Sequence, residues 1–175
     1  MEVYLVRHTE TICEKGICYG QSDVELLSPY LPQFERIKTQ IPAGAKVYSS
    51  PLTRCVTLAE YLSETAIQQD VRLMEMDFGD WEMKPWEAIP KDDFEPWMND
   101  FVNVQVPNGE AFTDLFHRVE DFLTNELREN TNKPIVIVAH AGVIRSILCS
   151  VTQLPLKDAF QNKVDFGAVL KIKID

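Results

Sequence analysis

The stretch VYLVRHTET, residues 3–11, decides the fold, because a short apolar run passes directly into a polar turn. Its apolar residues are continuous rather than alternating, which is typical of a strand covered by helices on both faces of a sheet. A second run of this kind, IVIVAHAG at residues 135–142, also leads into a histidine. The weaker run KVYS, residues 46–49, predicts a third strand. These strands indicate an α/β fold.

Helical patterns separate the strands. Asn108 is the predicted N-cap of the clearest helix, because asparagine side chains accept hydrogen bonds from the first free amides of a helix. Strands that alternate with helices predict a layered α/β architecture. The expected helices cover residues 33–40, 51–62, 109–128 and 142–151, and a last strand or strand pair covers residues 164–174.

The length of 175 residues predicts one domain, residues 1–175, around one core. One segment, residues 76–106, looks like an insertion into that domain, and we call it the flap. All three tryptophans of the protein lie within residues 76–101 of the flap. The same residues include eight acidic side chains and two basic ones. The flap is therefore expected to be a structured, aromatic and acidic element.

The charge of the chain restricts its partners. Lysine and arginine number 17 against 27 aspartates and glutamates, a net charge of -10, which argues against nucleic acid or an anionic membrane as a partner. An anionic ligand would need a local basic pocket. The four cysteines form no C-x-x-C pair, and no apolar run is long enough for a signal peptide or a membrane span. We therefore expect reduced thiols and a cytoplasmic protein.

Such a basic pocket is predicted where the strands end. Ligands of open α/β sheets bind outside the carboxyl ends of the strands, and His8 and His140 each follow a predicted strand. If these strands are parallel neighbours, the two histidines meet in one crevice. Arg7 precedes the first histidine, and Arg54 follows the strand at residues 46–49. Guanidinium groups bind phosphate oxygens in matched geometry, so a phosphate group is the expected ligand.

Two other interpretations of this pocket remain open. The histidines could be buried core residues that are merely hydrogen-bonded, as many histidines are. They could also bind a metal ion, although two guanidinium groups beside them would repel a cation and neither lies in an H-x-x-x-H spacing. We expect no metal and no cofactor, because the protein cations can neutralise a transferring phosphoryl group and a neutral imidazole can attack phosphorus.

Four motifs occur in order along the chain: RHTET at residues 7–11, SSPLTRCVT at 49–57, EMDFGDWE at 75–82 and VAHAGVIR at 138–145. Together they resemble the histidine phosphatase superfamily, whose fold is called phosphoglycerate mutase-like. The resemblance implies a three-layer α/β/α sandwich with a mostly parallel mixed sheet. It implies that His8 is a nucleophile that forms a phosphohistidine, and that Arg7, Arg54 and His140 hold the phosphoryl oxygens. Glu75 would protonate the leaving oxygen and then activate water, with Asp77, Asp80 and Glu82 as alternatives.

Some residues depart from the family pattern. Thr9 stands where the family usually has glycine, and Glu14 stands where many members have an asparagine that contacts phosphate. A carboxylate would repel phosphate, so Glu14 is expected to point away and Gln21 or Ser22 to take its place. The residues expected to contact the substrate besides the catalytic set are Thr9, Gln21, Ser22, Ala141, Trp81 and Glu82.

Within the superfamily, residues 16–24 and the FGDWE segment look most like the α-ribazole phosphatases. That resemblance implies a small phosphomonoester substrate, α-ribazole 5′-phosphate or adenosylcobalamin 5′-phosphate, and a role in cobalamin biosynthesis. The acidic flap would repel a polyanion, while its aromatic rings could stack on a heteroaromatic leaving group. The alternatives are a phosphoglycerate mutase or broad-specificity phosphatase on the same site, and a non-catalytic phosphate-binding module. A homodimer is left open.

Overall fold

The computed structural model describes residues 1–127 and 133–174. Its core is a five-stranded sheet with the strand order β3-β2-β4-β1-β5. All neighbouring pairs are parallel except β1 and β5, so the predicted mixed, mostly parallel sheet is confirmed. The strands are β1 (Glu2–Arg7), β2 (Lys46–Ser49), β3 (Gln68–Gln69), β4 (Ile135–Ala139) and β5 (Val169–Lys173).

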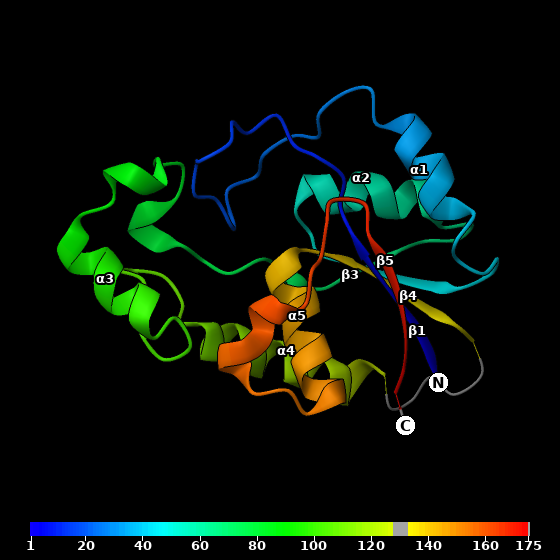
Figure 1. The fold of residues 1–175 in the computed structure, drawn as a ribbon. Coiled ribbons are helices and arrows are strands. Elements are labelled where there is room, and N and C mark those ends of the chain that lie inside the picture. The colour runs from blue at the N-terminus through cyan, green and yellow to red at the C-terminus, as the bar shows by residue number, and fades with distance from the viewer. Residues whose placement is uncertain (128–132, 175) are drawn as a thin grey trace.

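Two pairs of helices cover the sheet and form the outer layers (Figure 1). Side chains of β1 alternate between the faces, as the period of a strand requires: Val3 and Leu5 belong to one core cluster, Tyr4 and Val6 to the other. Buried residues of α4 and α5 join the first cluster, and those of α1 and α2 join the second. The three-layer sandwich is therefore confirmed. The helices are α1 (Leu31–Lys38), α2 (Thr53–Leu62), α4 (Phe112–Glu126) and α5 (Ala141–Thr152).

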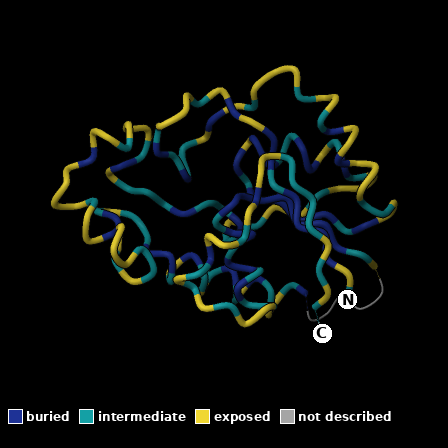
Figure 2. The backbone as a smooth tube through the Cα atoms, viewed as in Figure 1, coloured by how far each residue is buried: buried dark blue, intermediate teal, exposed yellow. Residues whose placement is uncertain are grey.

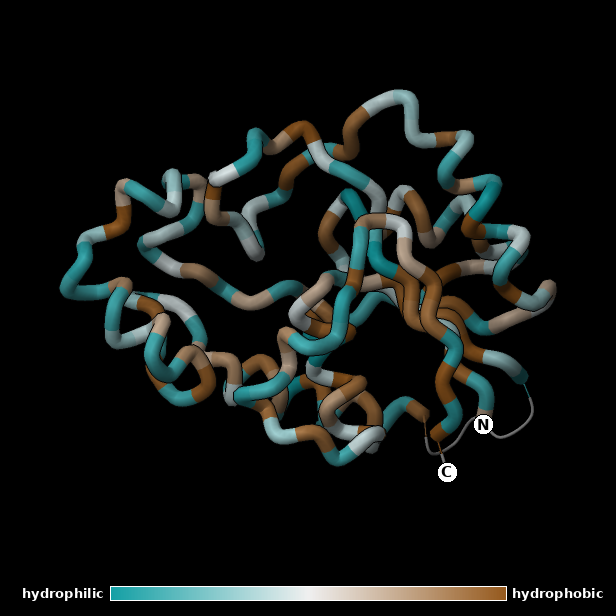
Figure 3. The backbone as a smooth tube through the Cα atoms, viewed as in Figure 1, coloured by the Kyte–Doolittle hydropathy of each residue, from teal (hydrophilic) through white to brown (hydrophobic). Residues whose placement is uncertain are grey.

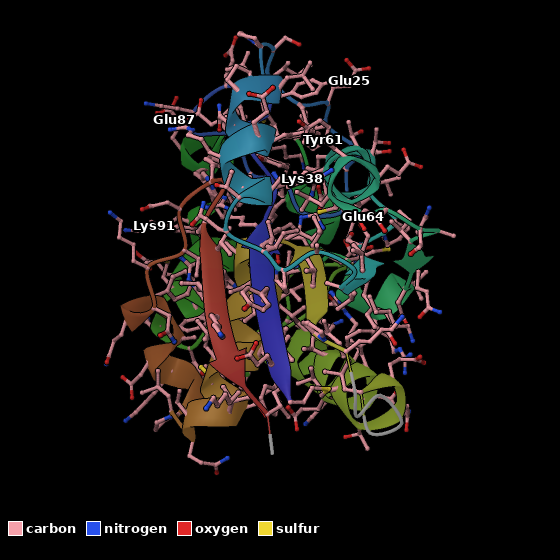
Figure 4. The ribbon with its side chains drawn as sticks, turned by 90° about the vertical axis from the view of Figure 1, so that its right-hand side faces the viewer. Glu25, Lys38, Tyr61, Glu64, Glu87 and Lys91 are labelled. Atoms are coloured by element: carbon pink, nitrogen blue, oxygen red, sulfur yellow. The ribbon has the colours of Figure 1, made fainter. Side chains whose placement is uncertain are left out.

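The central strands β1 and β4 are buried and apolar except at the two ends of β1, Glu2 and Arg7. Figure 2 shows them in dark blue and Figure 3 in brown at the middle of the molecule, and every residue of β4 is buried. Parallel pairing sets Arg7 opposite Ala139, so the residues that follow β1 and β4 leave the sheet at the same edge. On the outside of the sandwich, Lys38 of α1 donates a hydrogen bond to the backbone oxygen of Tyr61 in α2 (Figure 4).

Several predicted boundaries need correction. The first helix begins at Leu31, two residues early, because Pro32 fits the first helical turn, where no amide donor is needed. Asn108 does not cap α4: it has a φ of 55° and its amide donates to Asp80, while Asp114 accepts from the backbone of Ala111 at the helix start. The predicted helix end near residue 128 lies outside the described residues. Of the predicted strand at 164–174, only residues 169–173 are β-structure.

The flap folds around its aromatic side chains and is set apart from the helices that cover the sheet (Figure 1). Its longest element is α3 (Lys91–Asn99). Trp81 lies 5.5 Å from Trp97 and 6.3 Å from Trp86 between ring centroids. Among the helices in the described segments, none combines the length and apolar character that a membrane crossing requires. Short 3-10 helices lie at Val71–Leu73 (η1), Gly79–Trp81 (η2), Trp86–Ala88 (η3) and Leu156–Gln161 (η4).

Candidate active site

His8 and His140 meet at the carboxyl-terminal edge of the sheet. Their ring centroids are 5.2 Å apart with an interplanar angle of 64°, and the two side chains are 3% and 1% exposed. Each histidine directly follows its strand, β1 or β4. The prediction that the two histidines share one crevice is therefore confirmed.

Within residues 1–127 and 133–174, only one ring nitrogen of His8 has a hydrogen-bond partner. Its Nδ1 lies 2.8 Å from the backbone oxygen of Thr9, and a carbonyl oxygen can only accept, so Nδ1 carries the proton. The lone pair is then on Nε2. Burial, and next the nearby Arg54 and Arg7 charges, lower the pKa of His8 to about 3. The imidazole is thus neutral at physiological pH, as a nucleophile must be.

Arg54 lies in the first turn of α2 and is almost completely buried. Its guanidinium donates to the backbone oxygens of Ser22, at 2.8 Å, and of Gly20. It also lies over the ring of Tyr19, with Cζ 5.2 Å from the ring centroid. The loop that contains residues 19–22 therefore holds this cation in place.

Arg7 is held from the other side by the segment before β5. One terminal nitrogen donates to the backbone oxygen of Val164 at 2.7 Å, and Cζ lies 3.8 Å from the centroid of Phe166. Its Nε is buried without a hydrogen-bond partner among the described residues. Phe166 also lies 5.6 Å from His8 between ring centroids. The sequence did not indicate a site role for Val164 and Phe166, because their apolar pattern is also typical of a last strand.

His140 contacts two residues of the motif SSPLTRCVT for which the sequence predicted no role, Ser50 and Cys55. Its Nε2 lies 2.8 Å from Ser50 Oγ and 3.5 Å from Cys55 Sγ. Burial, followed by the charges of His8, Arg54 and Arg7, lowers the pKa of His140 well below its ordinary value. Both imidazoles are therefore neutral, and the guanidinium groups of Arg7 and Arg54 supply the positive charge that a phosphate group needs.

Glu75 lies against the turn between β4 and α5. Its carboxylate oxygens accept from the backbone of Met76 at 3.0 Å and of Gly142 at 3.1 Å. A Cβ built at Gly142 would lie 2.3 Å from a Glu75 carboxylate oxygen, so a side chain there would displace the acid. The other candidate acids are engaged within the flap and the loop against it: Asp77 accepts from Gly79, Asp80 from Asn108 and Glu82 from residues 20–22.

A pair of partly buried charges, Arg118 and Glu110, fixes the segment that carries Glu75. Arg118 of α4 forms a salt bridge with Glu110 at 2.8 Å and donates to the backbone oxygen of Glu75 at 2.9 Å. The same guanidinium donates to the backbone oxygens of Met74 and Arg72. Glu110 in turn accepts from the backbone of Asp77. Glu110 thus supports the segment that carries Glu75 from behind.

The flap residues expected at the substrate are placed differently. Trp81 is 1% exposed and packs inside the flap, so the prediction that it contacts the substrate needs correction. Glu82 instead binds the loop beside it, and accepts from the hydroxyl of Ser22 at 2.6 Å. The side chain of Gln21 donates to the backbone oxygen of Glu75. These three side chains shape the site from within the protein.

The remaining residues that were predicted for the active site, Thr9, Ala141 and Glu14, lie at the margins of the site. Thr9 is completely buried, and its hydroxyl has no partner among the described residues. Ala141 begins α5 next to His140. Glu14 is exposed and lines a hollow with Ile12, as expected of a carboxylate that does not face phosphate.

A mainly apolar pocket of about 210 Å³ adjoins Glu75 and the start of α5. Trp86 and Trp97, rather than Trp81, are the tryptophans that line it. Arg145 also lines it: its Nε donates to the backbone oxygen of Asn162 at 3.1 Å, and Cζ lies 4.7 Å from the centroid of Phe160. The aromatic residues of the wall that the sequence analysis missed are Phe101, Phe112 and Phe160.

All four cysteines are free thiols. Within residues 1–127 and 133–174, no group of three or more histidine, cysteine or acidic side chains gathers as metal ligands would. What the arrangement offers is a neutral imidazole with a lone pair on Nε2, two nearby cations and a second imidazole, with the Glu75 carboxylate against the start of the helix that follows His140. Such a set can transfer a phosphoryl group to His8 and then to water.

Comparisons with known proteins agree with this chemistry. Residues 3–175 match the family model described as histidine phosphatase superfamily (branch 1). The adenosylcobalamin/alpha-ribazole phosphatase of Escherichia coli K12 is 27% identical, over 100% of this chain and 91% of that protein. Phosphoserine phosphatase 1 of Hydrogenobacter thermophilus is 30% identical, over 89% and 78%. The crystal structure of the alpha-ribazole phosphatase from Shigella flexneri superposes with a TM-score of 0.90 at 27% identity, over 100% and 91%.

Proposed function

The chain belongs to branch 1 of the histidine phosphatase superfamily and is a phosphatase, and from that premise we propose that it hydrolyses a small phosphomonoester through a phosphohistidine intermediate without a metal ion. The observation that carries the proposal is the neutral His8, with a free Nε2, beside two guanidinium groups and a second imidazole. The substrate is a small molecule rather than nucleic acid or a membrane component, because the net charge of -10 repels both.

In the first step, Nε2 of His8 attacks phosphorus in line with the ester bond. The P–O bond breaks, and its electron pair goes to the leaving oxygen, which takes a proton from the carboxylic acid of Glu75. Arg7, Arg54 and an N–H of His140 stabilise the charge on the phosphoryl oxygens. The products of this step are the free alcohol and a phosphorylated His8.

In the second step, the carboxylate of Glu75 takes a proton from water while the water oxygen attacks phosphorus. The P–N bond breaks, inorganic phosphate leaves, and His8 returns to its neutral form. Glu75 thus acts first as acid and then as base, and its place between the backbone amides of Met76 and Gly142 keeps it in one position for both steps.

For the leaving group we propose α-ribazole, so that the substrate is α-ribazole 5′-phosphate or its larger form adenosylcobalamin 5′-phosphate. The apolar pocket beside Glu75 supports this choice, because aromatic walls favour a flat heteroaromatic group over a polyanion. The test compares kcat/KM for α-ribazole 5′-phosphate, 3-phosphoglycerate, phosphoserine and a nucleoside monophosphate. We expect α-ribazole 5′-phosphate to exceed the others by at least tenfold; equal values would reject this substrate.

One feature favours a second candidate, a phosphomonoester whose leaving group bears a carboxylate, such as phosphoserine. Arg145 lines the pocket, and no carboxylate of the described residues lies within ion-pairing distance of its guanidinium. A guanidinium group binds a carboxylate in bidentate geometry, which a methionine in its place cannot do. If phosphoserine is the substrate, Arg145→Met raises its KM strongly and leaves the KM of α-ribazole 5′-phosphate almost unchanged.

A further inference from the structure

Next to the active site lies a small, buried polar cluster of three side chains, Ser50, Cys55 and His140. Ser50 follows β2, Cys55 lies in the first turn of α2, and His140 follows β4. Ser50 and Cys55 are fully buried, and both lie against Nε2 of the imidazole, at 2.8 Å and 3.5 Å. Because these groups are buried, water cannot replace a missing hydrogen-bond partner, and each polar hydrogen needs an acceptor within the cluster.

The hydroxyl of Ser50 has one hydrogen to donate. Its oxygen already accepts from the backbone amide of Leu52 at 3.3 Å. The possible acceptors for its own hydrogen are Nε2 of His140 and the sulfur of Cys55. Burial raises the pKa of the Cys55 thiol, which therefore stays protonated, and a neutral thiol sulfur is a weak acceptor. The imidazole nitrogen is the better acceptor.

The other nitrogen of His140 has no such partner. Among the described residues, the one potential hydrogen-bond partner of Nδ1 is Cys55 Sγ, 3.9 Å away. A neutral imidazole carries its hydrogen on one nitrogen only, and which one depends on the hydrogen bond that the other nitrogen makes. A nitrogen that faces a phosphoryl oxygen must carry the hydrogen, because a lone pair there would repel the anion.

We propose that Ser50 is a positioning residue for His140: its hydroxyl donates to Nε2 and holds the imidazole in the tautomer protonated at Nδ1. His140 then presents Nδ1–H to the phosphoryl group. His8, whose Nδ1–H donates to Thr9, has its lone pair on Nε2. The two neutral histidines thus carry the same tautomer for opposite tasks, one as the nucleophile and the other as a hydrogen-bond donor.

The test measures the tautomer directly. In protein labelled with ¹⁵N at histidine, long-range ¹H–¹⁵N spectra near pH 7 without substrate distinguish the two tautomers, and the chain has only three histidines to assign. The His140→Asn variant identifies the signal. We expect a protonated Nδ1 and an unprotonated Nε2 in the wild type. A protonated Nε2 at His140 would overturn the proposal, whatever the variants do.

Kinetics supply the second readout, which rests on the proposed phosphatase reaction, whereas the spectrum does not. In Ser50→Ala we expect a mixture of tautomers and a loss in kcat/KM of ~10- to 100-fold, by analogy with the loss of a group that orients a metal-binding histidine. Two matched variants should keep the wild-type tautomer: Cys55→Ala, and Ser49→Ala, since the Ser49 hydroxyl donates to the Ser50 carbonyl instead. An unchanged tautomer in Ser50→Ala would refute the role of Ser50.

Discussion

The carboxylate of Glu82 accepts a 2.6 Å hydrogen bond from the hydroxyl of Ser22, a residue 60 positions earlier in the chain. It also accepts from the backbone amides of Gly20, Gln21 and Ser22. Burial alone would raise the pKa of Glu82, but these hydrogen bonds outweigh it and lower the pKa. Because the carbonyls of Gly20 and Ser22 receive the guanidinium of Arg54, Glu82 determines where that cation lies.

Removal of the Glu82 carboxylate should therefore affect phosphate binding from a distance. In Glu82→Ala we expect the free energy of unfolding to fall by ~1–3 kcal/mol, because several partly buried backbone amides lose their acceptor. We also expect KM to rise about tenfold as Arg54 loses its fixed support. Urea denaturation and steady-state kinetics measure the two effects. The control is Asp80→Ala, whose exposed carboxylate accepts from Asn108, just after the flap; an equal KM change there would contradict the argument.

The two histidines should respond differently to truncation. His8→Ala removes the nucleophile, so kcat should fall by ~10⁴ or more and no phosphorylated protein should form. His140→Ala removes a hydrogen-bond donor, so kcat should fall by ~10²–10³ while the phosphorylated protein still forms. Steady-state kinetics and acid-labile ³²P incorporation measure these effects. Wild-type turnover in His8→Ala would exclude His8 as the nucleophile.

The reaction should not depend on a metal ion. Arg7 and Arg54 supply the positive charge for the phosphoryl group, so dialysis against EDTA should leave kcat/KM unchanged within experimental error. The measurement compares dialysed enzyme with and without added Mg²⁺, Mn²⁺ or Zn²⁺. Complete loss of activity that one of these ions restores would point to a metallophosphatase instead.

The tryptophans should separate substrate binding from folding. Trp86 lines the pocket beside Glu75, so Trp86→Ala should raise the KM of an aromatic phosphomonoester by about tenfold and leave that of a small aliphatic one nearly unchanged. Trp81 packs inside the flap, so Trp81→Phe should lower the melting temperature without this preference. If both variants shift both substrates equally, the pocket does not bind the leaving group.

Local pattern made the sheet and the crevice predictable. Two continuous apolar runs each lead into a histidine. If the runs form neighbouring parallel strands, the histidines that follow them must meet at one edge of the sheet, as His8 and His140 do. Contacts between distant segments were not predictable. The sequence pattern around an aromatic residue such as Trp81 is the same whether the side chain lines a pocket or packs in a core. Phe166 contacts Arg7 only because β5 runs antiparallel to β1. The bond between Ser22 and Glu82 likewise follows from the folded loop.

Acid should destabilise the protein through its buried histidines. In the unfolded chain a histidine binds a proton near pH 6.5, but folded His8 does so only at about pH 3. Between these pH values the unfolded state therefore binds more protons than the folded state. The free energy of unfolding should decrease as the pH is lowered through this range, by ~1.4 kcal/mol per pH unit for each such histidine. Urea denaturation at pH 7, 6, 5 and 4 measures the slope. In His8→Asn the free energy of unfolding should depend less steeply on pH than in the wild type, by the contribution of one histidine. The carboxylates contribute equally to both slopes, so the difference between the slopes reports His8 alone. Equal slopes would show that His8 protonates in the folded state.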